Sequence, residues 1–249
     1  MKFHLPLGPL QNDFYGKILL SIQKYYPIGI KSGDPAYHQF PGQVELGKII
    51  VDNIHNNKNF KVGWKDFEKE IKKETRKEID GQTYATKPSF SSRLIIKRFK
   101  HAELIHIKSL HFSVSLVGPF FTIFGMDETA ITDDKDGREL FFGAVNIVTV
   151  SPYKEFESDF NYLRTKIEGR FTGYKFIPFR LGSMLIDGLY DPFEENKECT
   201  IYSALFDDCL DGYNIYKTRG DSSYGFDEWI NREGDYKIDV SLGPPPERP

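Results

Sequence analysis

The 249-residue sequence has little cysteine and no long hydrophobic run. Its two cysteines, Cys199 and Cys209, are too few for a disulfide framework, and no C-x-x-C pair exists to bind a metal or support redox chemistry. The apolar runs are far shorter than the roughly 20 residues that a membrane helix needs. Prolines interrupt the amino terminus before a secretory signal can form. We therefore expect a soluble, cytoplasmic protein that does not enter a membrane.

The sequence also lacks the short motifs that mark common enzymes. Neither Gly-x-x-x-x-Gly-Lys-Ser/Thr nor Gly-x-Gly-x-x-Gly occurs, which argues against the phosphate loops of nucleotide-binding proteins. The sequence around Ser183 lacks the second glycine of a serine-hydrolase elbow. The acidic turn at 133–137 lacks the glutamate of a calcium-binding loop. No motif predicts a cofactor or a metal, and a non-enzymatic role is favoured, although catalysis stays an open alternative.

The composition is that of a folded protein. Hydrophobic residues make up 39% and charged residues 28%, a balance that excludes disorder and leaves ample material for a core. Apolar residues recur at helical spacing in 1–86, and alternation typical of strands begins soon afterwards. The prediction is an α+β fold with an antiparallel or mixed sheet, packed helices and a helical N-terminal region. The boundaries are 1–86 and 87–249, either as two domains or as one continuous domain, and the C-terminal part of the second region is acidic.

Three helices are expected in the first region. The first contains Ile18 and Ile22 and stops at Pro27, the second covers about 44–54, and the third runs from Trp64 to the Asp80-Gly81 pair. In the second region, Ser151 is expected to cap a further helix.

Strands are expected at 110–116, 120–126, 139–150 and 200–206, among others. In the first of these, Leu110, Phe112 and Val114 alternate with polar residues, which predicts a half-buried strand with one polar face. A last helix near Phe226 and a closing strand at 236–240 are also expected.

Charge is distributed unevenly along the chain. Residues 1–126 hold 19 basic and 11 acidic side chains, a net of +8, whereas residues 127–249 hold 14 and 25, a net of -11. The halves either attract each other or present different surfaces to partners. Within the basic half, 58–108 carries 14 Lys and Arg against 7 acidic residues, with aromatic residues interleaved. This pattern suits nucleic-acid binding, with four candidate residues: Arg93, Lys97, Arg98 and Lys100.

The acidic stretch from Asp187 to Asp211 is the most unusual feature. It has eight carboxylates, Lys197 as its only cation, and several aromatic residues. Carboxylates around aromatic anchors suit an interface with a basic protein, because charge steers the encounter and rings supply buried contact. The predicted partner-binding residues are Tyr190, Asp191, Phe193, Glu194, Glu195, Asp207, Asp208 and Tyr213. A solvated acidic loop beside a buried strand would give the same pattern.

Three of the six histidines lie close together, at 101, 106 and 111. On one strand His106 and His111 face opposite sides, so a shared metal is not expected. His106, His111 and Ser113 are predicted to line a cleft only if the polar strand face borders one.

The leading hypothesis is a non-enzymatic module that binds a basic protein. A bacterial immunity or antitoxin protein that masks a basic toxin would have this chemistry. Two alternatives remain. One is a metal-dependent hydrolase that uses C-terminal carboxylates and a histidine, and the other is a nucleic-acid-binding protein that uses segment 58–108.

Overall fold

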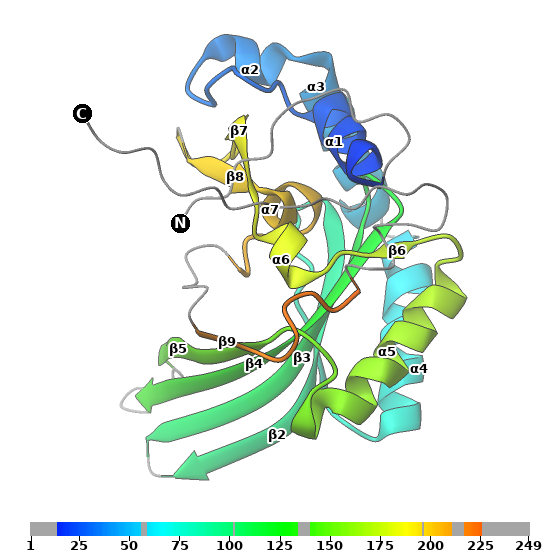
Figure 1. Cartoon of the computed structure of the whole chain (residues 1–249), viewed down its shortest axis with the longest axis vertical. Helices are drawn as coiled ribbons and strands as arrows, with labels where there is room; N and C mark the ends of the chain where they lie inside the picture. Colours follow the sequence, from blue (N-terminus) through cyan, green and yellow to red (C-terminus); the bar gives the residue numbers. More distant parts are fainter. Residues whose placement is uncertain are drawn as a thin grey trace, which may run out of the picture.

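A computed structural model of the chain describes residues 14–55, 59–101, 103–133, 140–195, 197–210 and 217–225. Within these residues a seven-stranded mixed sheet has the order β1-β2-β3-β4-β5-β9, and β6 pairs with β4 (Figure 1). Neighbours from β1 to β5 are antiparallel, whereas β6 and β9 add in parallel. The strands are β1 (Ile79–Gly81), β2 (Ser89–His101), β3 (Leu104–Ser115), β4 (Phe120–Asp133), β5 (Leu140–Thr149), β6 (Lys175–Phe176) and β9 (Thr218–Arg219).

Helices pack on both sides of this sheet. Helices α4 and α5 lie along one face, while α6, α7 and the small β7–β8 hairpin lie on the other side, next to α1–α3 (Figure 1). This arrangement confirms the predicted α+β fold with a helical N-terminal region. The remaining elements are α1 (Phe14–Tyr25), α2 (Pro35–Gln39), α3 (Pro41–Ile50), the π-helical η1 (Val51–His55) and η2 (Asn59–Trp64), α4 (Lys65–Thr75), the 3-10 turn η3 (Lys154–Phe156), α5 (Glu157–Arg170), α6 (Phe179–Gly182), β7 (Leu185–Tyr190), β8 (Glu198–Thr200) and α7 (Ile201–Leu205).

Aromatic side chains fill the space between α4 and the sheet. Trp64 is fully buried, stacks on Phe90 with ring centroids 5.7 Å apart, and contacts Phe112 of β3 at 5.6 Å. Its indole N–H donates to Ser92 Oγ at 3.1 Å, so the polar end of this large side chain is also satisfied. Trp64, at the end of η2, and Phe67 of α4, which also contacts Phe112, thus pack on the apolar face of β3.

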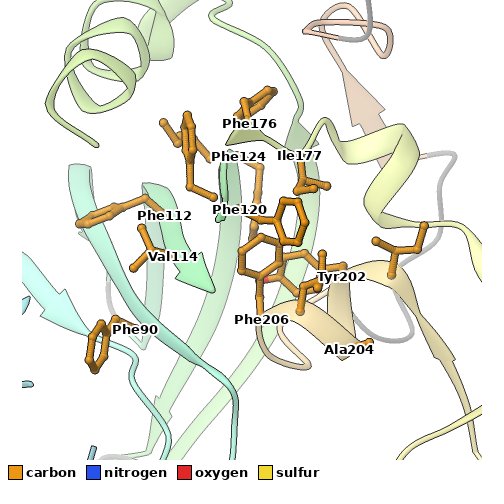
Figure 2. Close-up of a cluster of buried hydrophobic side chains, with 14 of the residues drawn as sticks. Phe90, Phe112, Val114, Phe120, Phe124, Phe176, Ile177, Tyr202, Ala204 and Phe206 are labelled. Carbon is orange, nitrogen blue, oxygen red and sulfur yellow. The ribbon is translucent and has the colours of Figure 1, made fainter. Parts of the chain in front are cut away.

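The opposite face of the sheet is also covered. Tyr202 of α7 contacts Phe124 of β4 at 5.9 Å and Phe206 at 5.4 Å, and all three are buried. Figure 2 shows this cluster together with Phe112 and Val114, which lie on the α4 side. The prediction of a half-buried strand at 110–116 is therefore wrong, because α7 and the segment after it cover its polar face.

Two helix boundaries differ from the sequence prediction. Helix α4 ends at Thr75 because Arg76 adopts a left-handed conformation with φ 56°, and Ile79 lies in β1 instead. Ser151 does not cap a helix: its Oγ accepts from the Asp221 N–H at 2.9 Å, and α5 starts only after η3.

The predicted strand at 200–206 is wrong beyond its first residue. Thr200 ends β8 and caps α7, since its Oγ1 accepts from the Ser203 N–H while Ser203 Oγ accepts from the Thr200 N–H. This reciprocal pair satisfies backbone donors at the helix start and fixes a short helix where apolar residues suggested a strand. The elements expected near Phe226 and at 236–240, and the turn at 134–137, lie outside the described residues.

One cluster of buried side chains joins the two predicted regions. It contains Ile18 and Ile22 of α1 as well as Phe112 of β3 and Leu205 of α7. The described helices include none long and apolar enough to cross a membrane.

Candidate functional site

The turn of the β7–β8 hairpin is held by the buried carboxylate of Asp191. Its Oδ1 accepts from the N–H groups of Phe193 at 2.7 Å and Glu194 at 3.1 Å. Aspartate commonly closes a turn in this way. Asp191 therefore faces inward and fixes the backbone on which its neighbours are presented.

The hairpin is also fastened to the helical N-terminal region. Tyr37 is fully buried and donates through its hydroxyl to the Tyr190 carbonyl at 2.6 Å. Ser32 Oγ donates to the Glu194 carbonyl at 3.2 Å, and the Gly29 N–H donates to the Gly188 carbonyl at 2.7 Å. Residues far apart in sequence thus hold both the strand and the turn in place.

The turn presents an exposed aromatic ring among carboxylates. Phe193 is 58% exposed, and Glu194, Glu195 and Glu198 are exposed beside it. Glu194 pairs with Lys197 at 2.5 Å. We call the four residues Phe193, Glu194, Glu195 and Glu198 the acidic hairpin surface.

Lys87 lies beside this surface and is almost fully buried. Its Nζ is 3.1 Å from Asp208, 3.9 Å from Asp191 and 5.5 Å from the centroid of the Phe193 ring. Asp208 is 43% exposed, so it extends the acidic surface beyond the hairpin.

The predicted partner-binding residues are thus divided by burial. Phe193, Glu194, Glu195 and Asp208 are exposed, and Tyr190 is half-buried. Asp191 and Asp207 are buried and bond within the chain, whereas Tyr213 lies outside the described residues.

A second site is a cavity of about 260 Å³ on the polar face of β3, which we call the polar cavity. It lies between strands β2–β4 and the segment after α7. His111 and Ser113 line it, but His106 does not. The other lining residues are Gln82, Tyr84, Ser91, Ser92, Arg93, Met126, Glu128, Asp207, Asp208 and Cys209.

Asp207 forms one wall of the polar cavity. It accepts from the Tyr202 hydroxyl at 2.6 Å, Ser91 Oγ at 2.8 Å and the Cys209 N–H at 2.9 Å. Burial raises its pKa, although these donors pull the pKa down. The carboxylate therefore links β2, α7 and the loop behind it.

His111 and Cys209 meet in the same cavity, with Nδ1 and Sγ 3.6 Å apart. Burial, with a contribution from nearby Arg93, lowers the pKa of His111 to about 3. Burial, together with neighbouring carboxylates, raises the pKa of the Cys209 thiol well above its usual range. At neutral pH both groups are uncharged, and a thiolate nucleophile would need the opposite shift.

Arg93 spans the cavity wall between two acids. Its Nη2 is 2.8 Å from Asp80 and its Nη1 is 3.4 Å from Glu128. Burial raises the pKa of Glu128. Arg93 is thus half-buried and paired, which leaves Lys97, Arg98 and Lys100 as the exposed members of the predicted basic set.

His106 lies in a different environment from His111. Its Nε2 is 2.5 Å from Asp127, and its ring stacks on the exposed Phe99 with centroids 6.2 Å apart. In the part of the chain that the structure describes, no group of three His, Cys, Asp or Glu residues is placed to hold a metal ion.

Sequence reasoning missed Tyr84, Glu128 and Cys209 as cavity residues. The register of β3 and β4 places Glu128 at the cavity, whereas Tyr84 precedes β2 and Cys209 follows α7, and no local motif encodes this arrangement. Comparison with protein-family models, with curated proteins and with solved structures gave no match.

Proposed function

We propose that this protein is a non-enzymatic module that binds a basic protein partner through the acidic hairpin surface. The observation that carries the proposal is the 58% exposed ring of Phe193, which stands among exposed carboxylates on a turn fixed from within the chain. Aromatic residues commonly supply the anchors of interfaces, and complementary charge speeds association.

The internal fastening of the turn supports binding. The Asp191 cap and the bond from Tyr37 to the Tyr190 carbonyl already order this backbone before a partner arrives. A preordered surface loses less conformational entropy on association, so more of the contact energy is retained as affinity. An immunity protein or antitoxin that masks a basic toxin is one class of protein that would use such a surface.

The test uses two variants with the same change in total charge. Glu194→Lys with Glu195→Lys reverses the hairpin surface, whereas Asp66→Lys with Glu157→Lys reverses two exposed acids on α4 and α5. We expect a basic protein to be captured from lysate of the source organism by the parent and the α4/α5 variant, and lost by the hairpin variant. With the purified partner, hairpin reversal should slow association and flatten its dependence on salt.

The variant Phe193→Ala tests the contribution of the aromatic ring to binding separately from that of the carboxylates. Because the ring is exposed, the variant should fold normally by circular dichroism, yet bind the captured protein roughly 30-fold more weakly, as for about 2 kcal/mol lost at an interface anchor. Equal capture by the parent, the hairpin variant and Phe193→Ala would overturn the proposal.

A second candidate is nucleic-acid binding at the far end of β2. Lys97, Arg98, Phe99 and Lys100 are consecutive and exposed, and Lys97 Nζ lies 4.4 Å from the centroid of the Phe99 ring. Cations beside a stacking ring suit single-stranded nucleic acid. This candidate predicts that a labelled oligonucleotide binds with an affinity that falls steeply with salt, and that Lys97→Glu with Lys100→Glu abolishes binding.

A further inference from the structure

The polar cavity has an excess of negative groups. Three carboxylates and one guanidinium line it: Glu128, Asp207, Asp208 and Arg93. Arg93 is already paired with Asp80, and Asp208 with Lys87. With these two partners included, four carboxylates stand against two cations, a formal charge of -2. Glu128 and Asp208 are themselves paired with Arg93 and Lys87, so it is the net negative charge of the group that favours an added cation over an anion.

The cavity also has an unused hydrogen-bonding atom. His111 is 7% exposed and lines the cavity, and its Nε2 has no partner within the described residues. The Cys209 thiol can donate toward Met126 Sδ at 3.9 Å, which leaves Sγ to accept from Nδ1–H in one tautomer of His111. In that tautomer Nε2 keeps a free lone pair. A buried acceptor without a donor is rare in folded proteins, and a bound ligand is one way to satisfy it.

We infer that the polar cavity is a binding site for a guanidinium or alkylammonium group. Glu128 and Asp208 face its charge, and His111 Nε2 accepts one of its N–H bonds. Burial of Glu128 strengthens such a pairing, since charge-assisted hydrogen bonds are stronger where water is scarce.

The dimensions and the opening of the cavity fit a small group. Its volume of about 260 Å³ is below the range of roughly 300–1,000 Å³ found for drug-sized ligands. Tyr84, 51% exposed, and Asp208, 43% exposed, also line the cavity, so it meets solvent on their side. The end of an arginine or lysine side chain, or a small free amine, is the appropriate size.

The test titrates the full chain with ethylguanidinium, with its uncharged analogue ethylurea as the control ligand. We expect saturable binding of ethylguanidinium by calorimetry and none of ethylurea. The ¹⁵N resonance of His111 Nε2 should shift during the titration, while those of the other histidines stay in place. Glu128→Gln should weaken binding about tenfold, because a hydrogen bond to a charged group contributes that much. Glu157→Gln on α5 is the matched control and should leave binding unchanged.

Asp208→Asn is a second variant, on an exposed residue; it should also weaken binding, and it keeps the test decisive where Glu128→Gln fails to fold. Absence of saturable binding, equal binding of ethylurea, or undiminished binding by the folded variants would overturn the inference.

Binding of a short peptide that contains arginine tests whether the bound group belongs to a protein or to a small molecule. Tighter binding of the peptide than of ethylguanidinium assigns the group to a protein partner, in which case the site rests on the proposed function. Binding of the free guanidinium alone assigns it to a small molecule. Glu194 and Glu195 do not line the cavity, so failure here and failure of the hairpin proposal are distinguishable.

Discussion

Over residues 109–115 both faces of β3 are buried, but they are stabilised by different interactions. On one face Leu110, Phe112 and Val114 pack on aromatic rings such as Trp64. On the other face His111 contacts Cys209 Sγ at 3.6 Å, and His111, Ser113 and Asp207 line the polar cavity. The apolar face derives its stability from contacts between apolar side chains, whereas the stability of the polar face depends on whether each polar atom has a hydrogen-bond partner. Substitutions on the two faces should therefore change the free energy of unfolding by different amounts and even in opposite directions.

The largest change in the free energy of unfolding is expected for a substitution on the apolar face. Phe112→Ala removes a fully buried ring between Trp64 and Phe67, and should lower the free energy of unfolding by about 3–5 kcal/mol because a cavity remains. Urea denaturation followed by circular dichroism measures this. A loss below 1 kcal/mol would mean that the aromatic cluster is loosely packed.

An effect that depends on pH is expected at His111. Its pKa is lowered to about 3 in the folded state from an ordinary value of 6.5, so the unfolded chain binds a proton there between these values and the folded chain does not. Stability should therefore fall as pH drops through this window, by up to about 1.4 kcal/mol per pH unit from this group. His111→Gln should show a shallower fall in the same window. Parallel curves for parent and variant would show that His111 does not remain uncharged.

The smallest expected change is an increase in stability, at Ser109. Ser109 is fully buried, and its Oγ has no partner in the described structure. Ser109→Ala removes a hydroxyl that is desolvated without compensation, and should raise the free energy of unfolding by up to about 1 kcal/mol. A clear loss of stability in thermal or urea unfolding would indicate that this hydroxyl has a partner after all.

Local patterns predicted the fold class but not every element. Helical spacing of Ile18 and Ile22 and the stop at Pro27 were sufficient for α1, because a helix depends on neighbours in sequence. The stretch 200–206 was read as a strand because it is short and apolar, a case in which periodicity cannot separate strand from buried helix. Its Thr200–Ser203 capping pair was the signal that would have identified the helix.

The residue types of the candidate sites could be predicted from the sequence, but the positions of these residues in the fold were harder to predict. The density of acids and rings indicated a candidate surface within 187–211, and Phe193, Glu194 and Glu195 are exposed in that stretch. The inward positions of Asp191 and Asp207 could not be predicted, since each depends on donors brought together by the tertiary fold. The polar cavity depends on strand register and on a covering segment from elsewhere in the chain.

The bonds that fasten the hairpin also constrain the order of assembly. Tyr26, just after α1, donates to the Ala204 carbonyl, and Tyr37 of α2 donates to the Tyr190 carbonyl. The N-terminal region thus acquires native partners that the ribosome adds more than 150 residues later. Until then Ile18 and Ile22, which pack in the shared core, have no complete surface to cover them. Contacts this distant in sequence slow folding and prolong the exposure of apolar surface. The N-terminal helices therefore complete their packing only after residues 190–204 have been synthesised.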